Sequence, residues 1–259
     1  MKRTQISLQE LETRVPAIFA SAPRSDVSKE YSFYPTIKIV EMFQKENWLP
    51  VEAGQVNKEP DKKIYAEHYI RFAKPGLIYE KNEIVPEIYL RNSHDRSCRL
   101  FISLGLYRVV CSNGLITNFA DLFQLSQIHI SITFGDIRRI IEEAITRFEL
   151  VNEKIENYRN IKLSENEKID FAKKALSLRQ AENVPPDAVL VPRRMQDMGN
   201  DLFTVFNVLQ ENLIKGGVNY IDPKTSKPTR LYAINEIRKS FSINYNLWLL
   251  MEAIAISKL

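Results

Sequence analysis

Glycine is scarce in this chain, with 8 residues in 259, and none of them forms a familiar phosphate-binding loop. The sequence contains neither GxxxxGK[ST] nor GxGxxG, so the backbone cradles that hold nucleotide phosphates in many enzymes are missing. The GxSxG and HExxH signatures of serine hydrolases and zinc proteases are missing as well. The motifs therefore give no support to a nucleotide-dependent or hydrolytic enzyme, and we expect no cofactor.

Cysteine and long apolar runs are also rare. The two cysteines, Cys98 and Cys111, suit a reducing compartment better than a disulfide scaffold. No uncharged apolar run approaches the roughly 20 residues of a membrane-spanning helix. The basic N-terminus MKRTQISLQELETR precedes no apolar stretch, unlike a secretory signal. We therefore expect a cytoplasmic protein without a membrane segment.

The pattern of apolar residues changes its period near residue 134. Before that point, runs with alternating polarity predict consecutive strands at 48–56, 63–73, 84–92, 98–111, 115–119 and 126–134. After it, apolar residues recur at helical spacing, and capping residues such as Ser164 precede them. The sequence therefore predicts an α+β fold, in which an antiparallel sheet in the N-terminal half packs against a mainly helical C-terminal half. We expect residues 1–134, with short N-terminal helices, and residues 135–259 to pack as one compact domain.

Three histidines are the main candidates for catalysis or metal binding. Their spacing matches no zinc motif, and His68 and His129 fall in predicted strands. His94 and Asp95, in the sequence NSHD, lie at a strand end and could form an acid–base or metal-binding pair. Asn, Ser and Asp are also typical of turns, where their side chains bond to the backbone. Both interpretations stay open, and we predict no metal.

Basic residues gather in and beside the central predicted strands. Their only acidic neighbour is Asp95, and Tyr107 shares strand parity with Arg99. A strand face of arginine and tyrosine suits a groove that follows a nucleic-acid backbone and stacks its bases. The alternative is a covered sheet whose arginines pair with helical carboxylates such as Glu142 or Glu143. The residues of this first cluster are Arg91, Asn92, His94, Arg96, Arg99, Tyr107 and Arg108.

A second basic cluster lies in the C-terminal half. Between residues 215 and 239, six lysines and arginines face only Asp222 and Glu236. Gly216 and Gly217 indicate a helix stop before this segment. Phosphate contact and a solvated loop explain the charge excess equally well. The predicted nucleic-acid-binding residues of this cluster are Arg193, Arg194, Lys215 and Arg230.

Several stretches together resemble a family of uncharacterised proteins found mainly on phages and plasmids. The stretches that carry the resemblance are VPEIYLRNSHDRSCRLFISLGLYRVVCSNGL (85–115), LSENEKIDFAKKALSLR (163–179), VPRRMQDMGNDLFTVFNVLQENLIKGG (191–217), PTR (228–230) and NYNLWLL (244–250). The family usually has glycine after NSHD, where this chain has Arg96, which argues against a left-handed turn there. The resemblance implies a mobile-element protein acting in a bacterial cytoplasm.

A fainter likeness covers Tyr34 through Phe72. Its order of short helix, aromatic-led strand, loop and second strand is similar to the start of the core of phage single-strand-annealing recombinases. That likeness implies DNA binding in a basic groove beside a β-hairpin, and assembly into homo-oligomers.

These observations predict a non-enzymatic nucleic-acid-binding protein, with single-stranded DNA as the favoured partner. It would be an annealing, replication or recombination accessory factor of a phage or plasmid. The first alternative is a mobile-element protein that binds and inhibits a host defence complex. The second is a metal-dependent enzyme that uses His94 and Asp95.

Overall fold

A computed structural model describes the chain except for residues 1–3, 28–32, 79–83, 109–112, 117–132 and 259. The described residues form two compact units, Met1–Leu150 and Val151–Leu259. Most of the predicted strand at 126–134, together with His129 and Cys111, lies outside the described residues. No helix in the described part of the chain combines the length and the apolar character needed to cross a membrane.

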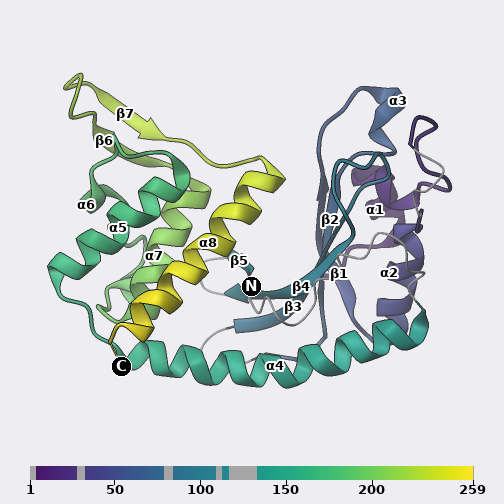
Figure 1. The fold of residues 1–259 in the computed structure, drawn as a ribbon, viewed down its shortest axis with the longest axis horizontal. Coiled ribbons are helices and arrows are strands. Elements are labelled where there is room, and N and C mark those ends of the chain that lie inside the picture. Colours follow the sequence, from purple (N-terminus) through teal and green to yellow (C-terminus); the bar gives the residue numbers. More distant parts are fainter. Residues whose placement is uncertain (1–3, 28–32, 79–83, 109–112, 117–132, 259) are drawn as a thin grey trace. The chain divides into compact units, whose positions relative to one another are not determined.

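An antiparallel sheet dominates the first unit (Figure 1). The five strands that the described residues form in this sheet follow one another in sequence order, and each pairs with the next. Such a meander needs only connections between neighbouring strands, which agrees with the consecutive strands predicted from the sequence. The predicted α+β class is confirmed. The strands are β1 (Leu49–Gln55), β2 (His68–Ala73), β3 (Ile84–Asn92), β4 (Phe101–Arg108) and β5 (Asn113–Ile116).

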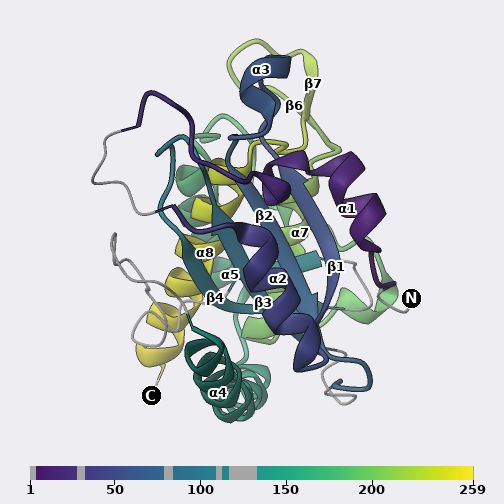
Figure 2. The same ribbon diagram turned by 90° about the vertical axis from the view of Figure 1, so that its right-hand side faces the viewer.

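Short helices cover one face of this sheet (Figure 2). They are α1 (Leu8–Arg14), the 3₁₀ turn η1 (Pro16–Phe19) and α2 (Thr36–Lys45), and α3 (Pro60–Lys63) lies in the β1–β2 connection. Phe43 of α2 stacks on Phe72 of β2 with 4.6 Å between ring centroids, and both rings are fully buried. The predicted strand at 63–73 is shorter than expected, because residues 63–67 complete α3 and the turn that follows.

Helix α4 (Phe134–Asn160) begins at the predicted change of period and runs through the boundary between the two units. Within the first unit, Phe148 of this helix packs beside Trp48, with 6.3 Å between ring centroids. The prediction that the two halves form one domain stays a prediction.

The second unit is built around α7 (Leu202–Lys215), in which every residue from Leu202 to Leu213 is buried. A helix buried on all sides belongs at the centre of its unit. Trp248 of α8 (Ile237–Ile256) contacts Phe206 of α7 edge to face, with 5.7 Å between ring centroids. The other elements are α5 (Glu165–Arg179), α6 (Pro186–Val189), η3 (Met195–Asp197), and the hairpin of β6 (Val218–Ile221) and β7 (Pro228–Leu231).

Candidate nucleic-acid interface

The NSHD loop after β3 is held by its own polar side chains. The Asn92 amide donates to the Thr36 hydroxyl at 3.0 Å. The Ser93 hydroxyl accepts from the Cys98 N–H at 2.9 Å and donates to the Cys98 carbonyl at 3.0 Å. Asn92, Ser93 and His94 are buried. These hydrogen bonds close the loop, which favours the turn over the catalytic interpretation.

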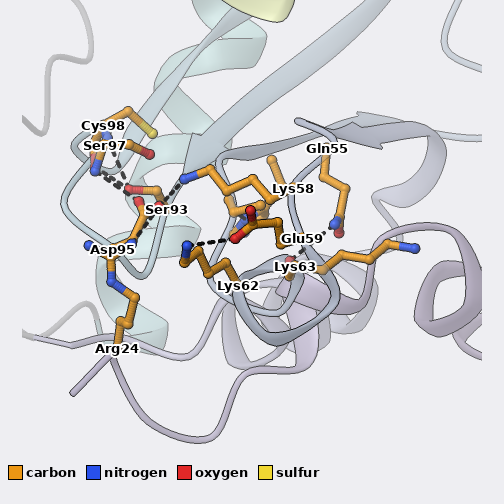
Figure 3. Close-up of polar contacts among 12 residues, drawn as sticks. Arg24, Gln55, Lys58, Glu59, Lys62, Lys63, Ser93, Asp95, Ser97 and Cys98 are labelled. Atoms are coloured by element: carbon orange, nitrogen blue, oxygen red, sulfur yellow. Dashed lines mark hydrogen bonds and ion pairs between the residues drawn. The ribbon is translucent and has the colours of Figure 1, made fainter. Parts of the chain in front are cut away.

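In the same loop, Asp95 lies between the basic side chains of Lys58 and Arg24 (Figure 3). It accepts the Ser97 N–H at 2.9 Å, forms an ion pair with Lys58, and lies 3.8 Å from Arg24. Burial opposes ionisation of the carboxyl, but hydrogen bonds from Lys58 and Ser97 outweigh it and lower the pKa of Asp95 to about 2. Asp95 is therefore a fixed anion that anchors the loop.

Two histidines share one hydroxyl inside the first unit. The Nε2 atoms of His68 and His94 lie 2.9 and 3.4 Å from Thr36 Oγ1. His68 Nδ1 lies 2.9 Å from the Ala66 carbonyl, so this nitrogen donates and Nε2 accepts from Thr36. Burial lowers the pKa of His68 to about 4 and that of His94 to about 3. Both rings are fully buried and neutral at pH 7.

No group of three or more His, Cys, Asp or Glu side chains among the described residues could hold a metal ion. Two further residues, Glu87 and His129, were candidates to complete an acid–base or metal site with His94 and Asp95. Glu87 forms an ion pair with Arg71, and His129 is outside the described residues.

Arg96 corrects one expectation drawn from the sequence. Its φ angle is 65°, in the left-handed region, although a non-glycine residue argued against such a turn. The Asp95 hydrogen bond to the Ser97 N–H spans this residue and holds the turn closed. The side chain of Arg96 is therefore presented to solvent, and that of Arg99 is also exposed.

The other arginines of the central strands are paired or buried. Arg91 forms an ion pair with the buried Glu67, with 2.6 Å between Nη2 and Oε1. Arg108 is 3% exposed and Tyr107 is 5% exposed. The carboxylate that neutralises Arg91 comes from Glu67, next to β2, and not from Glu142 or Glu143. The structure thus does not bring Arg91, Tyr107 and Arg108 together as an open groove.

Two predicted cations of the second unit are also neutralised. Arg194 forms ion pairs with Glu211 at 2.6 Å and Asp197 at 2.9 Å, and Lys215 lies 3.3 Å from Glu211. Glu211 and Asp197 are buried, so these pairs fix the loop before α7 onto the helix. Arg194 and Lys215 therefore have a structural role at this surface.

Arg193 and Arg230 differ from these neighbours. Among the described residues, neither forms an ion pair with a carboxylate. Arg193 Nε donates to Asn212 Oδ1 at 2.8 Å and its Nη2 donates to the Gly216 carbonyl. A Cβ placed on Gly217 would lie 3.3 Å from Arg230 Nη2 and 4.0 Å from Arg193 Nη2. The two guanidinium groups therefore converge over a residue without a side chain.

Tyr232 extends this surface and was missed by the sequence analysis. Asn219 pairs with Arg230 in the hairpin, and Tyr232 directly follows the end of β7, where continued alternation corresponds to the face of Arg230. Tyr232 is 73% exposed. The same three residues line a shallow pocket on the hairpin. We call Arg193, Gly217, Asn219, Arg230 and Tyr232 the hairpin surface. The alternation of β7 is the signal that could have identified Tyr232.

A family model and several known proteins match most of the chain. The model of a domain of unknown function, DUF932, matches residues 23–248. Two proteins of Escherichia coli strain K12, UPF0380 protein YafZ and UPF0380 protein YfjQ, are each 31% identical to the chain over 256 residues. Each alignment covers 96% of this chain and 91% of the relative. No solved structure matches the chain.

Proposed function

The chain belongs to the DUF932 family, and we propose that it binds single-stranded nucleic acid without acting as an enzyme. The hairpin surface is the main contact in this proposal. The exposed Arg96 and Arg99 of the first unit are additional phosphate contacts. The favoured partner is single-stranded DNA.

The observation that carries the proposal is the convergence of Arg193 and Arg230 beside an exposed tyrosine. Two unpaired guanidinium groups attract phosphate oxygens, to which their planar N–H donors are matched in geometry. An exposed aromatic ring next to them offers a stacking platform for an unpaired base. Duplex DNA keeps its bases stacked inside, so this combination suits a single strand.

The resemblance to phage and plasmid proteins supplies the proposed context. The chain would act as an annealing, replication or recombination accessory factor of a mobile element, in the cytoplasm of a bacterial host. Proteins of this kind cover a strand with several copies, so we include a homo-oligomer in the proposal.

Binding to labelled single-stranded DNA, measured by fluorescence anisotropy at low salt, tests the proposal. Tyr232→Ala should weaken binding by about fivefold or more, because one base loses its stacking partner. Tyr232→Phe is the matched control and should bind like the native chain. If the alanine and phenylalanine variants bind equally, Tyr232 does not stack a base.

One observation favours a second candidate, inhibition of a host defence complex. Val191, Met195 and Met198 are 62%, 84% and 68% exposed, and methionine-rich surfaces adapt well to protein partners. A pull-down from nuclease-treated host lysate separates the two candidates. A partner that remains after nuclease and is lost in Met195→Ser plus Met198→Ser supports inhibition.

A further inference from the structure

The space above Gly217 is flanked by two positive charges, and three carboxylates of the second unit are engaged by other groups. Glu211 and Asp197 form ion pairs with Arg194 and Lys215. Asp222 accepts the N–H groups of Lys224 and Thr225 and the amide of Asn183. Two guanidinium groups that converge without an anion repel each other, and a bound anion removes that repulsion.

Arg193 is held in place before any ligand arrives. Its acceptor Asn212 is fixed because the Asn212 amide donates to the carbonyls of Val189 and Val191 at 2.9 and 3.0 Å. The bonds from Arg193 engage Nε and Nη2, and Nη1 donates to none of the described residues. A donor whose orientation is fixed loses little conformational entropy when it binds a ligand.

The end of α7 would by itself disfavour an anion, because the C-terminus of a helix carries a partial negative charge. Here two arginines donate to carbonyls at and beside this helix end. Arg179 donates to the carbonyls of Leu213 and Tyr232, and Arg193 donates to that of Gly216. These bonds offset the helix end, and Arg230 adds a second charge that is not used for capping.

We propose that Arg193 and Arg230 bind the terminal phosphate of a single nucleic-acid strand, while Tyr232 stacks the adjoining base. This inference rests on the function proposed above and names the part of the strand that the hairpin surface recognises. A terminal phosphate monoester carries close to two negative charges at pH 7, because its second pKa is about 6. An internal phosphodiester carries one. Two unpaired arginines at one point match the former.

The test compares one oligonucleotide sequence with and without a terminal phosphate, using the full-length chain. Anisotropy is measured at pH 7.5 and low salt with the 5′-phosphorylated, 3′-phosphorylated and unphosphorylated strands. Each phosphorylated strand carries its label at the end without the phosphate, and it is compared with an unphosphorylated strand labelled at the same end. We expect at least about a fivefold preference for one phosphorylated end, since a second charge-assisted contact is gained. Arg230→Ala should remove the preference, and Arg230→Lys should keep only part of it, because lysine lacks the planar fork.

Arg14→Ala is the control, because it removes the same charge from an exposed residue of α1 in the first unit. The preference should remain in this variant. Equal binding of all three strands by the native chain overturns the inference, while the function proposed above would stand. If the native chain binds none of the three strands, both this inference and the proposed function are wrong.

Competition with small anions identifies the source of the phosphate. Inorganic phosphate at millimolar concentration should reduce the preference for the phosphorylated strand. If a nucleoside monophosphate binds as tightly as the phosphorylated strand, the ligand is a mononucleotide and the assignment to a strand end is wrong.

Discussion

Arg96 stands at a position where the backbone favours glycine, with φ at 65°. A side chain in the left-handed region costs about 1 kcal/mol relative to glycine. We predict that Arg96→Gly raises the free energy of unfolding by about this amount, measured by urea denaturation. Arg96→Ala is the control, since it removes the charge but keeps the strained backbone. Equal stabilisation by both variants would mean that charge, not backbone conformation, is responsible.

His68 and His94 make the stability of the first unit sensitive to acid. In the folded chain burial lowers the pKa of His68 to about 4 and that of His94 to about 3, whereas an unfolded histidine has a pKa near 6.5. At pH values between the folded and unfolded pKa, the unfolded chain binds protons that the folded chain does not. The free energy of unfolding therefore falls as pH falls. From pH 7 to pH 5 the free energy of unfolding should drop by about 2 kcal/mol for each histidine.

Urea denaturation at pH 7, 6 and 5 measures this dependence. His68→Gln removes one of the two titrating rings, so the drop should be about half as large in this variant. A free energy of unfolding that stays constant from pH 7 to pH 5 would show that the histidines are accessible to protons in the folded chain.

At the scale of elements, Gly216 and Gly217 serve different purposes although both have positive φ. A Cβ on Gly216 would lie 2.2 Å from the carbonyl carbon of Tyr232, so the chain after β7 could not pass the end of α7. On Gly217 a Cβ would meet no backbone atom, only the guanidinium ends of Arg230 at 3.3 Å and Arg193 at 4.0 Å.

We therefore predict that Gly217→Ala costs about 1 kcal/mol of stability, the conformational penalty alone. Gly216→Ala should cost more than twice as much, because the backbone of the hairpin must move. Thermal unfolding of the two variants, followed by circular dichroism, provides the comparison. Equal melting temperatures would show that the close approach at Gly216 is not important.

The elements were largely predictable from the sequence, but the partners of their charged residues were not. Alternating polarity identified β1 to β5, and the change of period located the start of α4, but β6 and β7 lie in a segment that was predicted as a basic loop. The ion pairs depend on register: Arg71 lies opposite Tyr89 and pairs with Glu87, and Arg91 lies opposite Tyr69 and pairs with Glu67. Each arginine thus reaches a diagonal neighbour, which no single strand reveals.

The candidate site was only partly predictable for the same reason, because its residues come from different elements. The sequence predicted Arg193 and Arg230, which lie in different elements, but gave no sign that they converge over Gly217. It also predicted Arg194 and Lys215, which the buried Glu211 neutralises. The alternation that places Tyr232 beside Arg230 was visible in the sequence, but its significance depends on the hairpin register.

For the whole molecule, a net charge of +4 conceals an uneven distribution of unpaired cations. Of the eight basic residues predicted to bind phosphate, Arg91, Arg108, Arg194 and Lys215 are buried or paired. Arg96, Arg99, Arg193 and Arg230 are exposed and form no ion pair within the described part of the chain. Only these four are expected to contact phosphate and to release counterions on binding.

The salt dependence of single-stranded DNA binding tests the central claim most directly. The logarithm of the association constant should fall with the logarithm of salt concentration, with a slope of about −0.7 for each phosphate contact. Arg193→Ala plus Arg230→Ala should therefore make the slope shallower by about 1.4, while Arg14→Ala leaves it unchanged. Parallel lines for the native chain and the double variant would show that these two arginines do not contact phosphate, which would contradict the account.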